Sequence, residues 1–180
     1  MRARPLSDIA GSLGGELLGP DATVTSVSTD TRTLEPGALF VALHGERTDG
    51  HGFVAEAFAR GAAGAVVQRE RRSSDPAGSV VLVDDPGRAL LELAGAERRA
   101  AEELVVVAIT GANGKTTTKD LAHAVISTRF HTHASPASFN NEVGLPLTVL
   151  GAPAETEVLV AELGARHEGD VRDLCEIVRP

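Results

Sequence analysis

The amino-acid sequence predicts an α/β protein in two parts, the second with a mainly parallel sheet. Short apolar runs that fit buried strands alternate along the 180 residues with amphipathic stretches that fit helices. One run, residues 104–109, is apolar without interruption, which is typical of a strand covered on both faces. The sequence changes character near residues 96–104, so we divide the chain into residues 1–100 and residues 101–180.

Local patterns predict the individual elements. Apolar residues at helical spacing predict helices over residues 6–14, 52–60 and 85–103, in a segment that contains Leu121 to Ile126, and over residues 141–150 and 169–178. Apolar and β-branched runs predict strands over residues 23–28, 39–43, 65–67, 80–83, 104–109 and 157–162, and one centred on Phe130. The polar residues 69–78 are predicted to form an exposed loop.

Composition opposes several classes of protein. With 17 Lys and Arg against 25 Asp and Glu, the net charge is −8, whereas a general nucleic-acid binder normally has a basic face. No apolar run reaches the about 20 residues needed to cross a bilayer, so we expect no membrane insertion. A single cysteine, Cys175, cannot form an internal disulfide, which favours a reducing, cytoplasmic location. It shares a helical stripe with Val171, Leu174 and Val178, which fits a core residue better than a nucleophile.

The clearest chemical signal follows the 104–109 run, where Thr110-Gly111-Ala112-Asn113-Gly114-Lys115-Thr116-Thr117 joins a predicted strand to a predicted helix. Glycines let backbone N–H groups converge on phosphate oxygens, and a helix N-terminus adds positive potential. Lys115 is placed to reach the β- and γ-phosphates, and the Thr116 hydroxyl to bind Mg²⁺. The standard pattern has glycine where Ile109 stands, so this is a variant P-loop. The alternative is a glycine-rich helix cap with a chance lysine.

Other polar residues follow the predicted strands of the second part. Glu162 ends the strand over residues 157–162, at the edge where ligands of open α/β sheets bind. A carboxylate there can hold a metal ion, although a charge beside the following turn explains it equally well. Asn140 and Asn141 are explained more simply as caps of the next helix. His131 and His133 lack an apparent third metal ligand, which favours surface histidines.

Taken together, these residues resemble the Mur ligases, which add amino acids to the peptidoglycan precursor. Residues 110–117 are similar to the ATP loop of the whole family. Residues 29–51, 140–148 and 162–170 resemble the MurF branch, which adds D-alanyl-D-alanine. The Glu-Leu-Gly-Ala start of the last stretch, with the following histidine and glycine, is what indicates that branch.

The resemblance implies both a fold and an activity. Residues 1–100 would form a small α/β domain that binds the UDP-sugar precursor, and residues 101–180 the first part of a P-loop ATPase domain with a mainly parallel sheet. The terminal carboxylate of UDP-N-acetylmuramoyl-tripeptide would attack the γ-phosphate of ATP, and the amine of D-Ala-D-Ala would then displace phosphate from the acyl phosphate. ATP and Mg²⁺ are the implied cofactors. We expect a monomer, and a truncated chain that is inactive alone.

The resemblance also assigns roles to individual residues. The implied catalytic residues are Lys115, Asn141 and Glu162, with Asn140 as the alternative to Asn141. The implied nucleotide-binding residues are Gly111, Ala112, Asn113, Gly114, Lys115, Thr116 and Thr117, and the Mg²⁺ ligands are Thr116 and Glu162. The implied contacts of the UDP precursor are Thr31, Arg32, Glu46 and Arg47. His167 either contacts substrate or is a simple turn residue.

Two other functions fit the same residues. A MurE-type ligase, which adds the third residue of the peptide, shares the N-terminal pattern. A non-catalytic module that binds a nucleotide or a UDP sugar would keep both predicted sites without turnover. A requirement for D-Ala-D-Ala separates the first alternative from the main prediction, and ATP turnover separates the second.

Overall fold

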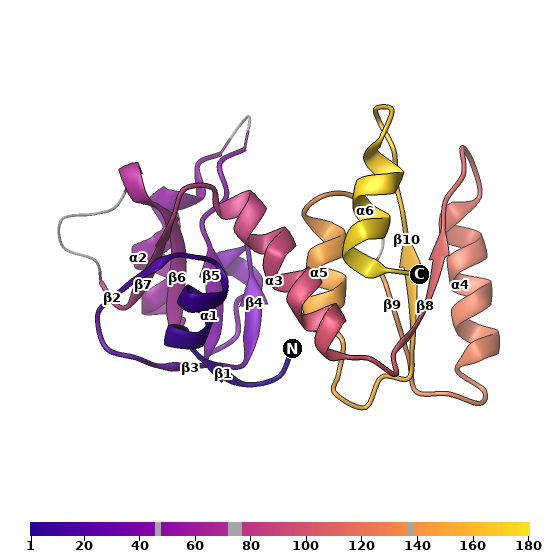
Figure 1. Ribbon diagram of the computed structural model, residues 1–180, viewed down its shortest axis with the longest axis horizontal. Helices are drawn as coiled ribbons and strands as arrows, with labels where there is room; N and C mark the ends of the chain where they lie inside the picture. Colours follow the sequence, from indigo (N-terminus) through magenta and orange to yellow (C-terminus); the bar gives the residue numbers. More distant parts are fainter. Residues whose placement is uncertain (46–47, 72–76, 137–138) are drawn as a thin grey trace. The chain divides into compact units, whose positions relative to one another are not determined.

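A computed structural model gives the fold of the chain and describes residues 1–45, 48–71, 77–136 and 139–180. The chain forms two compact units, an N-terminal unit of residues 2–93 and a C-terminal unit of residues 94–180 with Met1. Each unit combines helices with mainly parallel strands (Figure 1), so the predicted fold class is confirmed. In the part of the chain so described, no helix has the length and apolar character that a membrane span requires.

The N-terminal unit contains a five-stranded sheet with the order β2-β7-β6-β5-β4. The strands are β2 (Glu16–Leu18), β4 (Ser26–Ser28), β5 (Ala38–Val41), β6 (Gly64–Gln68) and β7 (Val80–Val83). Strands β4 to β7 are parallel, whereas β2 pairs with β7 in the antiparallel sense. The carboxyl ends of four strands therefore meet at one edge, where the chain continues into loops that are free to carry function.

The remaining elements of this unit are short. The helices are α1 (Leu6–Ser12), α2 (Val54–Ala59) and the first part of α3 (Pro86–Ala100). Three 3₁₀ turns cover Thr31–Thr33, Gly50–Phe53 and Arg69–Arg71, and β1 (Arg4–Pro5) pairs with β3 (Thr23–Val24). The core includes Phe40, Ala42, Ala57, Ala65, Val67, Val80 and Leu82. Gly64 lets α1 approach the sheet, because a Cβ there would lie 2.6 Å from Leu6 Cδ2.

The predicted strand over residues 23–28 is two strands in two sheets. Val24 and Val27 are three residues apart, so one continuous strand would point them to opposite faces. The chain instead leaves β3 at Thr25, whose N–H donates to the Gly37 carbonyl over 3.0 Å, before β4 begins. The prediction of a single strand was wrong because the pattern shows apolar positions but not the break between them.

The C-terminal unit contains three parallel strands in the order β8-β10-β9. These are β8 (Val105–Ile109), β9 (Thr132–Ala134) and β10 (Val158–Glu162). The helices besides the end of α3 are α4 (Lys115–Ile126), α5 (Gly144–Gly151) and α6 (Asp170–Val178). The central strand β10 is buried along its whole length, and its Glu162 is in register with Ile109 of β8. The carboxyl ends of these strands therefore lie together.

The prediction that residues 104–109 are covered on both faces is wrong. Val105 is 57% exposed, because β8 lies at the edge of the sheet and pairs, among the described residues, with β10 alone. Leu121 and Val125 of α4 are 64% and 69% exposed. An uninterrupted apolar run shows that both faces of a strand can be buried. Whether they are buried depends on which other segments of the protein cover them.

The remaining predictions agree with the structure to within a few residues, with two exceptions. The strand predicted around Phe130 begins after it, at Thr132, because the Phe130 N–H still donates to the Ile126 carbonyl at the end of the helix. The predicted loop over residues 69–78 opens with a 3₁₀ turn, and its residues 72–76 lie outside the described residues.

Candidate nucleotide site and N-terminal cleft

The loop between β8 and α4 has the form that an anion site requires. Gly111 and Gly114 have φ values of +150° and +76°, which favour glycine. The loop is exposed, and a Cβ on Gly114 would meet no atom within 4 Å. Among the hydrogen bonds of the described loops and turns, none uses the amides of Ala112, Asn113 or Gly114. Open space and available N–H donors thus lie in front of a helix N-terminus, where a phosphate is favoured.

Lys115 is the first residue of α4, so the helix itself places its ammonium group at this loop. The Nζ atom donates to the Gly111 carbonyl over 2.7 Å. A neutral carbonyl is a weaker partner for the ammonium group than a phosphate oxygen, because the phosphate adds the attraction between opposite charges. The side chain is therefore in place to change partner when a phosphate enters the loop.

Glu162 brings the ends of three segments together. Its side chain is buried at 3% exposure, and its two oxygens accept from the Thr116 hydroxyl and from the Asn140 amide, each over 2.9 Å. Parallel pairing explains the meeting, because Glu162 ends β10 beside the end of β8, from which the loop to α4 departs. A buried carboxylate at the carboxyl edge, next to a threonine hydroxyl, is a suitable pair of oxygen ligands for a hard cation.

The structure places Asn140, and not Asn141, beside Glu162. The Asn141 Oδ1 accepts from the N–H groups of Val143 and Gly144 over 3.3 and 2.9 Å, at the start of α5. Asn141 thus serves the helix-capping role that was the simpler interpretation of the sequence. Gly164 makes the position of Asn140 possible, because its N–H donates to the Asn140 carbonyl over 2.6 Å and a Cβ would come within 3.0 Å of the Asn140 side chain.

The donor set fits a cation that arrives with its nucleotide rather than a resident metal. Among the described residues, no group of three or more His, Cys, Asp or Glu side chains is arranged to hold a metal ion. Mg²⁺ commonly takes one or two protein ligands and completes its shell with phosphate oxygens and water. Thr116 and Glu162 match that pattern.

His131 is exposed and His133 half-buried. The pKa of His133 is lowered by burial and, to a smaller extent, by the charge of His123.

The predicted precursor contacts belong to the N-terminal unit. Arg32 is exposed, and its guanidinium donates to both Asp30 oxygens, over 2.6 Å in the shortest bond. These bonds lower the pKa of Asp30 to about 2, so the pair stays charged. The Thr31 hydroxyl is buried and donates to Glu56 over 3.1 Å. The two other predicted contacts, Glu46 and Arg47, lie outside the described residues.

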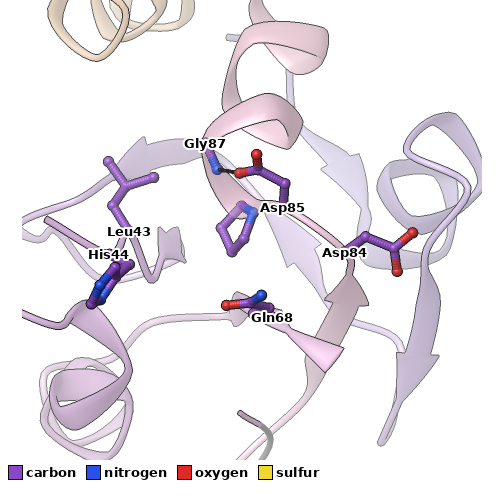
Figure 2. Close-up of a pocket in the computed structure, with 7 residues that line it drawn as sticks. Leu43, His44, Gln68, Asp84, Asp85 and Gly87 are labelled. Carbon is purple, nitrogen blue, oxygen red and sulfur yellow. Dashed lines mark hydrogen bonds between the residues drawn. The ribbon is translucent and has the colours of Figure 1, made fainter. Parts of the chain in front are cut away.

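A cleft of about 280 Å³ opens at the carboxyl edge of the N-terminal sheet. Figure 2 shows around it side chains that follow β5 and β7, the last residue of β6 and residues at the start of α3. Its lining residues are Leu43, His44, Gln68, Asp84, Asp85, Pro86 and Gly87. Asp85 accepts from the Gly87 and Arg88 N–H groups over 2.8 and 3.1 Å and so caps α3. The sequence was not expected to form this cleft, although His44, Gln68 and Asp84 each come directly after a predicted strand, which was a usable signal.

A series of hydrogen bonds links Gln68, which lines the cleft, to His51 and Asp49. The Gln68 N–H donates to His51 Nε2 over 2.9 Å, which leaves the proton on Nδ1, and Nδ1 lies 2.7 Å from Asp49 Oδ1. Asp49 also pairs with Arg71. The bonds from the His51 side chain and N–H lower the pKa of Asp49 to about 2.

Replacing Asp49 by asparagine should lower stability at pH 7 and have less effect in acid. A carboxyl group whose pKa is lowered on folding stabilises above its unfolded pKa of about 3.9, and that contribution is lost as the pH falls through the folded value of about 2. Thermal unfolding of the D49N variant and its parent, followed from pH 7 downwards, should show midpoints that differ above pH 4 and converge towards pH 2. The 97% exposed Asp84 provides the control D84N, and equal midpoints at pH 7 for D49N and its parent would contradict the argument.

His167 and Cys175 remain outside this arrangement. His167 is exposed, and its N–H and that of Arg166 each donate to Asp170 Oδ2 over 2.8 Å, which lowers the pKa of Asp170. This is the geometry of a turn at the start of α6. Cys175 is half-buried on α6, beside the buried Leu174.

A parallel sheet that delivers a glycine-rich loop, a lysine and a buried carboxylate to one edge is typical of P-loop proteins, which bind nucleoside triphosphates, and we place the chain in that class. The model of the Mur ligase family catalytic domain matches residues 23–142, and that of the Mur ligase middle domain matches residues 109–180. The chain belongs to the Mur ligase family.

Relatives and solved structures agree with this assignment. The chain is 42% identical to the UDP-N-acetylmuramoyl-tripeptide–D-alanyl-D-alanine ligase of Bacillus subtilis and 40% identical to that of Escherichia coli, over 100% and 97% of its length. It spans 40% and 38% of those two relatives. A crystal structure of MurF from Acinetobacter baumannii matches with a TM-score of 0.88 and 32% identity, over 100% of this chain and 40% of that one.

A second solved structure concerns the nucleotide. The crystal structure of the MurF ligase from Thermotoga maritima in complex with ADP matches with a TM-score of 0.73 and 32% identity. The match covers 86% of this chain and 35% of that chain. A similar protein therefore binds ADP.

Proposed function

We propose that the chain is the front part of an ATP-dependent ligase that joins D-Ala-D-Ala to UDP-N-acetylmuramoyl-tripeptide. The observation that carries this proposal is a hydrogen bond of 2.9 Å from the Thr116 hydroxyl to the buried Glu162 carboxylate, directly after an open glycine-rich loop. The similarity to UDP-N-acetylmuramoyl-tripeptide–D-alanyl-D-alanine ligases over the whole chain supports the choice of substrates. A cytoplasmic location and a monomeric state belong to the same proposal.

The residues of the loop suit the first chemical step. The peptide carboxylate and the triphosphate are both anions, so their approach requires positive charge and hydrogen-bond donors on the phosphates. The amides of Ala112, Asn113 and Gly114 and the ammonium group of Lys115 would supply these, because the amides are available in an exposed loop and the lysine begins the helix that follows it. The carboxylate then forms a bond to the γ-phosphorus as ADP leaves, and the amine of D-Ala-D-Ala replaces phosphate at the acyl carbon.

Thr116 and Glu162 would hold Mg²⁺ between the protein and the phosphates. When bound, the ion offsets the negative charge that builds up on the phosphate oxygens. The role of the chain is to keep the two oxygen ligands together before the ion arrives. Asn140, which donates to the other Glu162 oxygen over 2.9 Å, orients the carboxylate and replaces Asn141 in our assignment.

The N-terminal unit would bind the UDP end of the precursor at the carboxyl edge of its sheet. The exposed guanidinium of Arg32 follows β4 at that edge, and the 280 Å³ cleft lies at the ends of β5 to β7. An arginine fork suits a diphosphate, and a cleft with polar atoms suits a base or sugar. Thr31 would contribute by holding the turn through Glu56, and Glu46 and Arg47 remain predicted contacts.

The rest of the ligase would lie in sequence beyond this chain, which spans about 40% of its relatives. The exposed apolar side chains of Val105, Leu121 and Val125 support this proposal. Apolar groups exposed on an edge strand and on a helix are stabilised when a further segment covers them. We therefore propose that the 180 residues bind nucleotide but do not complete the reaction alone.

The natural polypeptide that contains these residues provides the test. Release of ADP from ATP and Mg²⁺ should require both UDP-N-acetylmuramoyl-tripeptide and D-Ala-D-Ala, and mass spectrometry should find the pentapeptide product. Release that depends on a diamino acid and UDP-N-acetylmuramoyl-dipeptide instead would establish the MurE-type alternative. Binding of ATP and the UDP precursor with no turnover under any substrate combination would establish a binding module.

A further inference from the structure

Lys119 is a buried lysine for which the proposed reaction has no use. It lies one helical turn beyond Lys115 on α4, and its side chain is 6% exposed. The sequence has two lysines among its 17 basic Lys and Arg residues, and both are on this helix. An ammonium group is costly to bury unless it is paired and hydrogen-bonded. An apolar residue would fill this position without that cost. The presence of a lysine therefore indicates that the N–H donors of its ammonium group are needed there.

Lys119 has one buried partner and one exposed partner. Its Nζ atom donates to the Ser135 carbonyl over 2.7 Å and lies 3.0 Å from Asp120 Oδ1. Asp120 is 66% exposed, so it balances the charge at the surface, whereas Ser135 is 1% exposed. The ammonium group is thus the donor that satisfies a buried backbone carbonyl at the end of β9.

Ser135 connects the Lys119 hydrogen bond to Glu162 through hydrogen bonds of its own. The Ser135 N–H donates to the Val160 carbonyl over 3.0 Å, and its Oγ accepts from the Glu162 N–H over 3.2 Å. The Glu162 carboxylate in turn accepts from Thr116, three residues before Lys119 on the same helix. A closed ring of contacts therefore runs from α4 through Ser135 to Glu162 and back to α4.

We propose that Lys119 is a positioning residue that sets, through Ser135, the distance between Glu162 and Thr116, so that both oxygens share one divalent cation. This inference rests on the proposed function. Without the ammonium group, the buried Ser135 carbonyl would lose its donor, and the segment would shift to reach water. The hydroxyl that holds the Glu162 backbone would move with it, and the two oxygens would no longer be matched to one ion.

The test measures Mg²⁺ dependence rather than activity alone. Calorimetry on the natural polypeptide gives the affinity for ATP in EDTA and over a range of Mg²⁺ concentrations. In a Lys119→Met variant, the affinity in EDTA should stay close to that of the parent, because the loop amides and Lys115 are intact. The Mg²⁺ concentration for half-maximal enhancement should rise about tenfold, at the low end of the range for residues that orient metal ligands.

Three further variants separate positioning from a merely structural role. Asp120→Asn removes the surface partner and should keep the Mg²⁺ dependence of the parent. Ser135→Ala keeps the backbone carbonyl but loses the Oγ acceptor, and it should raise the Mg²⁺ requirement in the same direction as Lys119→Met. Lys119→Arg keeps a hydrogen-bond donor, so its Mg²⁺ requirement should lie between those of the parent and of Lys119→Met. A structural role alone would lower the unfolding temperature and leave the Mg²⁺ requirement unchanged.

The outcomes distinguish this inference from the proposed function. A parent protein that binds ATP with Mg²⁺, while Lys119→Met and Ser135→Ala keep its Mg²⁺ requirement, overturns the positioning role and leaves the proposed function intact. A parent protein that binds no ATP overturns the proposed function and the inference with it. If Lys119→Met does not fold, Lys119→Arg and Ser135→Ala decide the question, and a Mg²⁺ requirement equal to that of the parent in both variants overturns the positioning role.

Discussion

Replacing Lys115 with alanine should lower the rate of ADP formation by the natural polypeptide on the order of 10²–10³-fold, the usual loss when one donor to a developing charge is removed. The ammonium group is the charged donor at the loop, where it now contacts the Gly111 carbonyl. Phosphate charge grows on the way to the transition state, so kcat should fall more than the affinity for ATP. Steady-state kinetics and calorimetry at saturating Mg²⁺ measure the two effects.

A matched control is Arg129→Ala, which also removes one positive charge from the C-terminal unit. Arg129 is exposed and lies just beyond the C-terminal end of α4, whereas the loop precedes the N-terminal end of that helix. Its variant should keep the rate of the parent within about twofold, since surface substitutions of this kind change little. A K115A variant with near-normal turnover would show that the loop does not act on the phosphates, and the ligase proposal would fail.

Glu162→Gln should abolish most of the Mg²⁺-dependent turnover while leaving the fold intact. The glutamine keeps the size of the side chain, and its amide pairs with Asn140 through the oxygen and with Thr116 through the nitrogen. What it loses is the charge that would attract the cation. We expect a rate loss on the order of 10²–10³-fold, because a metal ion typically supplies several kcal/mol of charge stabilisation.

Comparison with two other variants isolates the charge. Glu162→Ala removes the acceptors of two donors at a site that is 3% exposed, so it should also lower stability, by about 1–3 kcal/mol for each donor left without a partner. Glu142→Gln removes an exposed carboxylate close in sequence to Asn140 and should change neither stability nor rate. Urea unfolding and Mg²⁺ titration of the rate measure both properties, and an E162Q variant that needs no more Mg²⁺ than the parent would rule out Glu162 as a metal ligand.

Much of the candidate site was predictable because its parts are local in sequence. The loop over residues 110–117 joins one strand to one helix, and glycine spacing with the lysine indicates phosphate binding without any distant contact. Glu162 was predictable as a strand end for the same reason. The partner of Glu162 was not, because adjacent asparagines at 140 and 141 are equivalent in sequence, and the close approach of Gly164 decides which one faces the carboxylate.

Local patterns of residues were enough to predict the class of fold, the glycine-rich loop and most strands and helices, since each depends on residues that are close together in the chain. The three-dimensional structure was needed to find that Val105 is exposed, that residues 23–28 enter two sheets and that Lys119 contacts Ser135. These facts depend on which distant segments pack together. Burial and hydrogen bonding across such segments are settled by the free energy of the whole unit, so no local pattern of residues contains them.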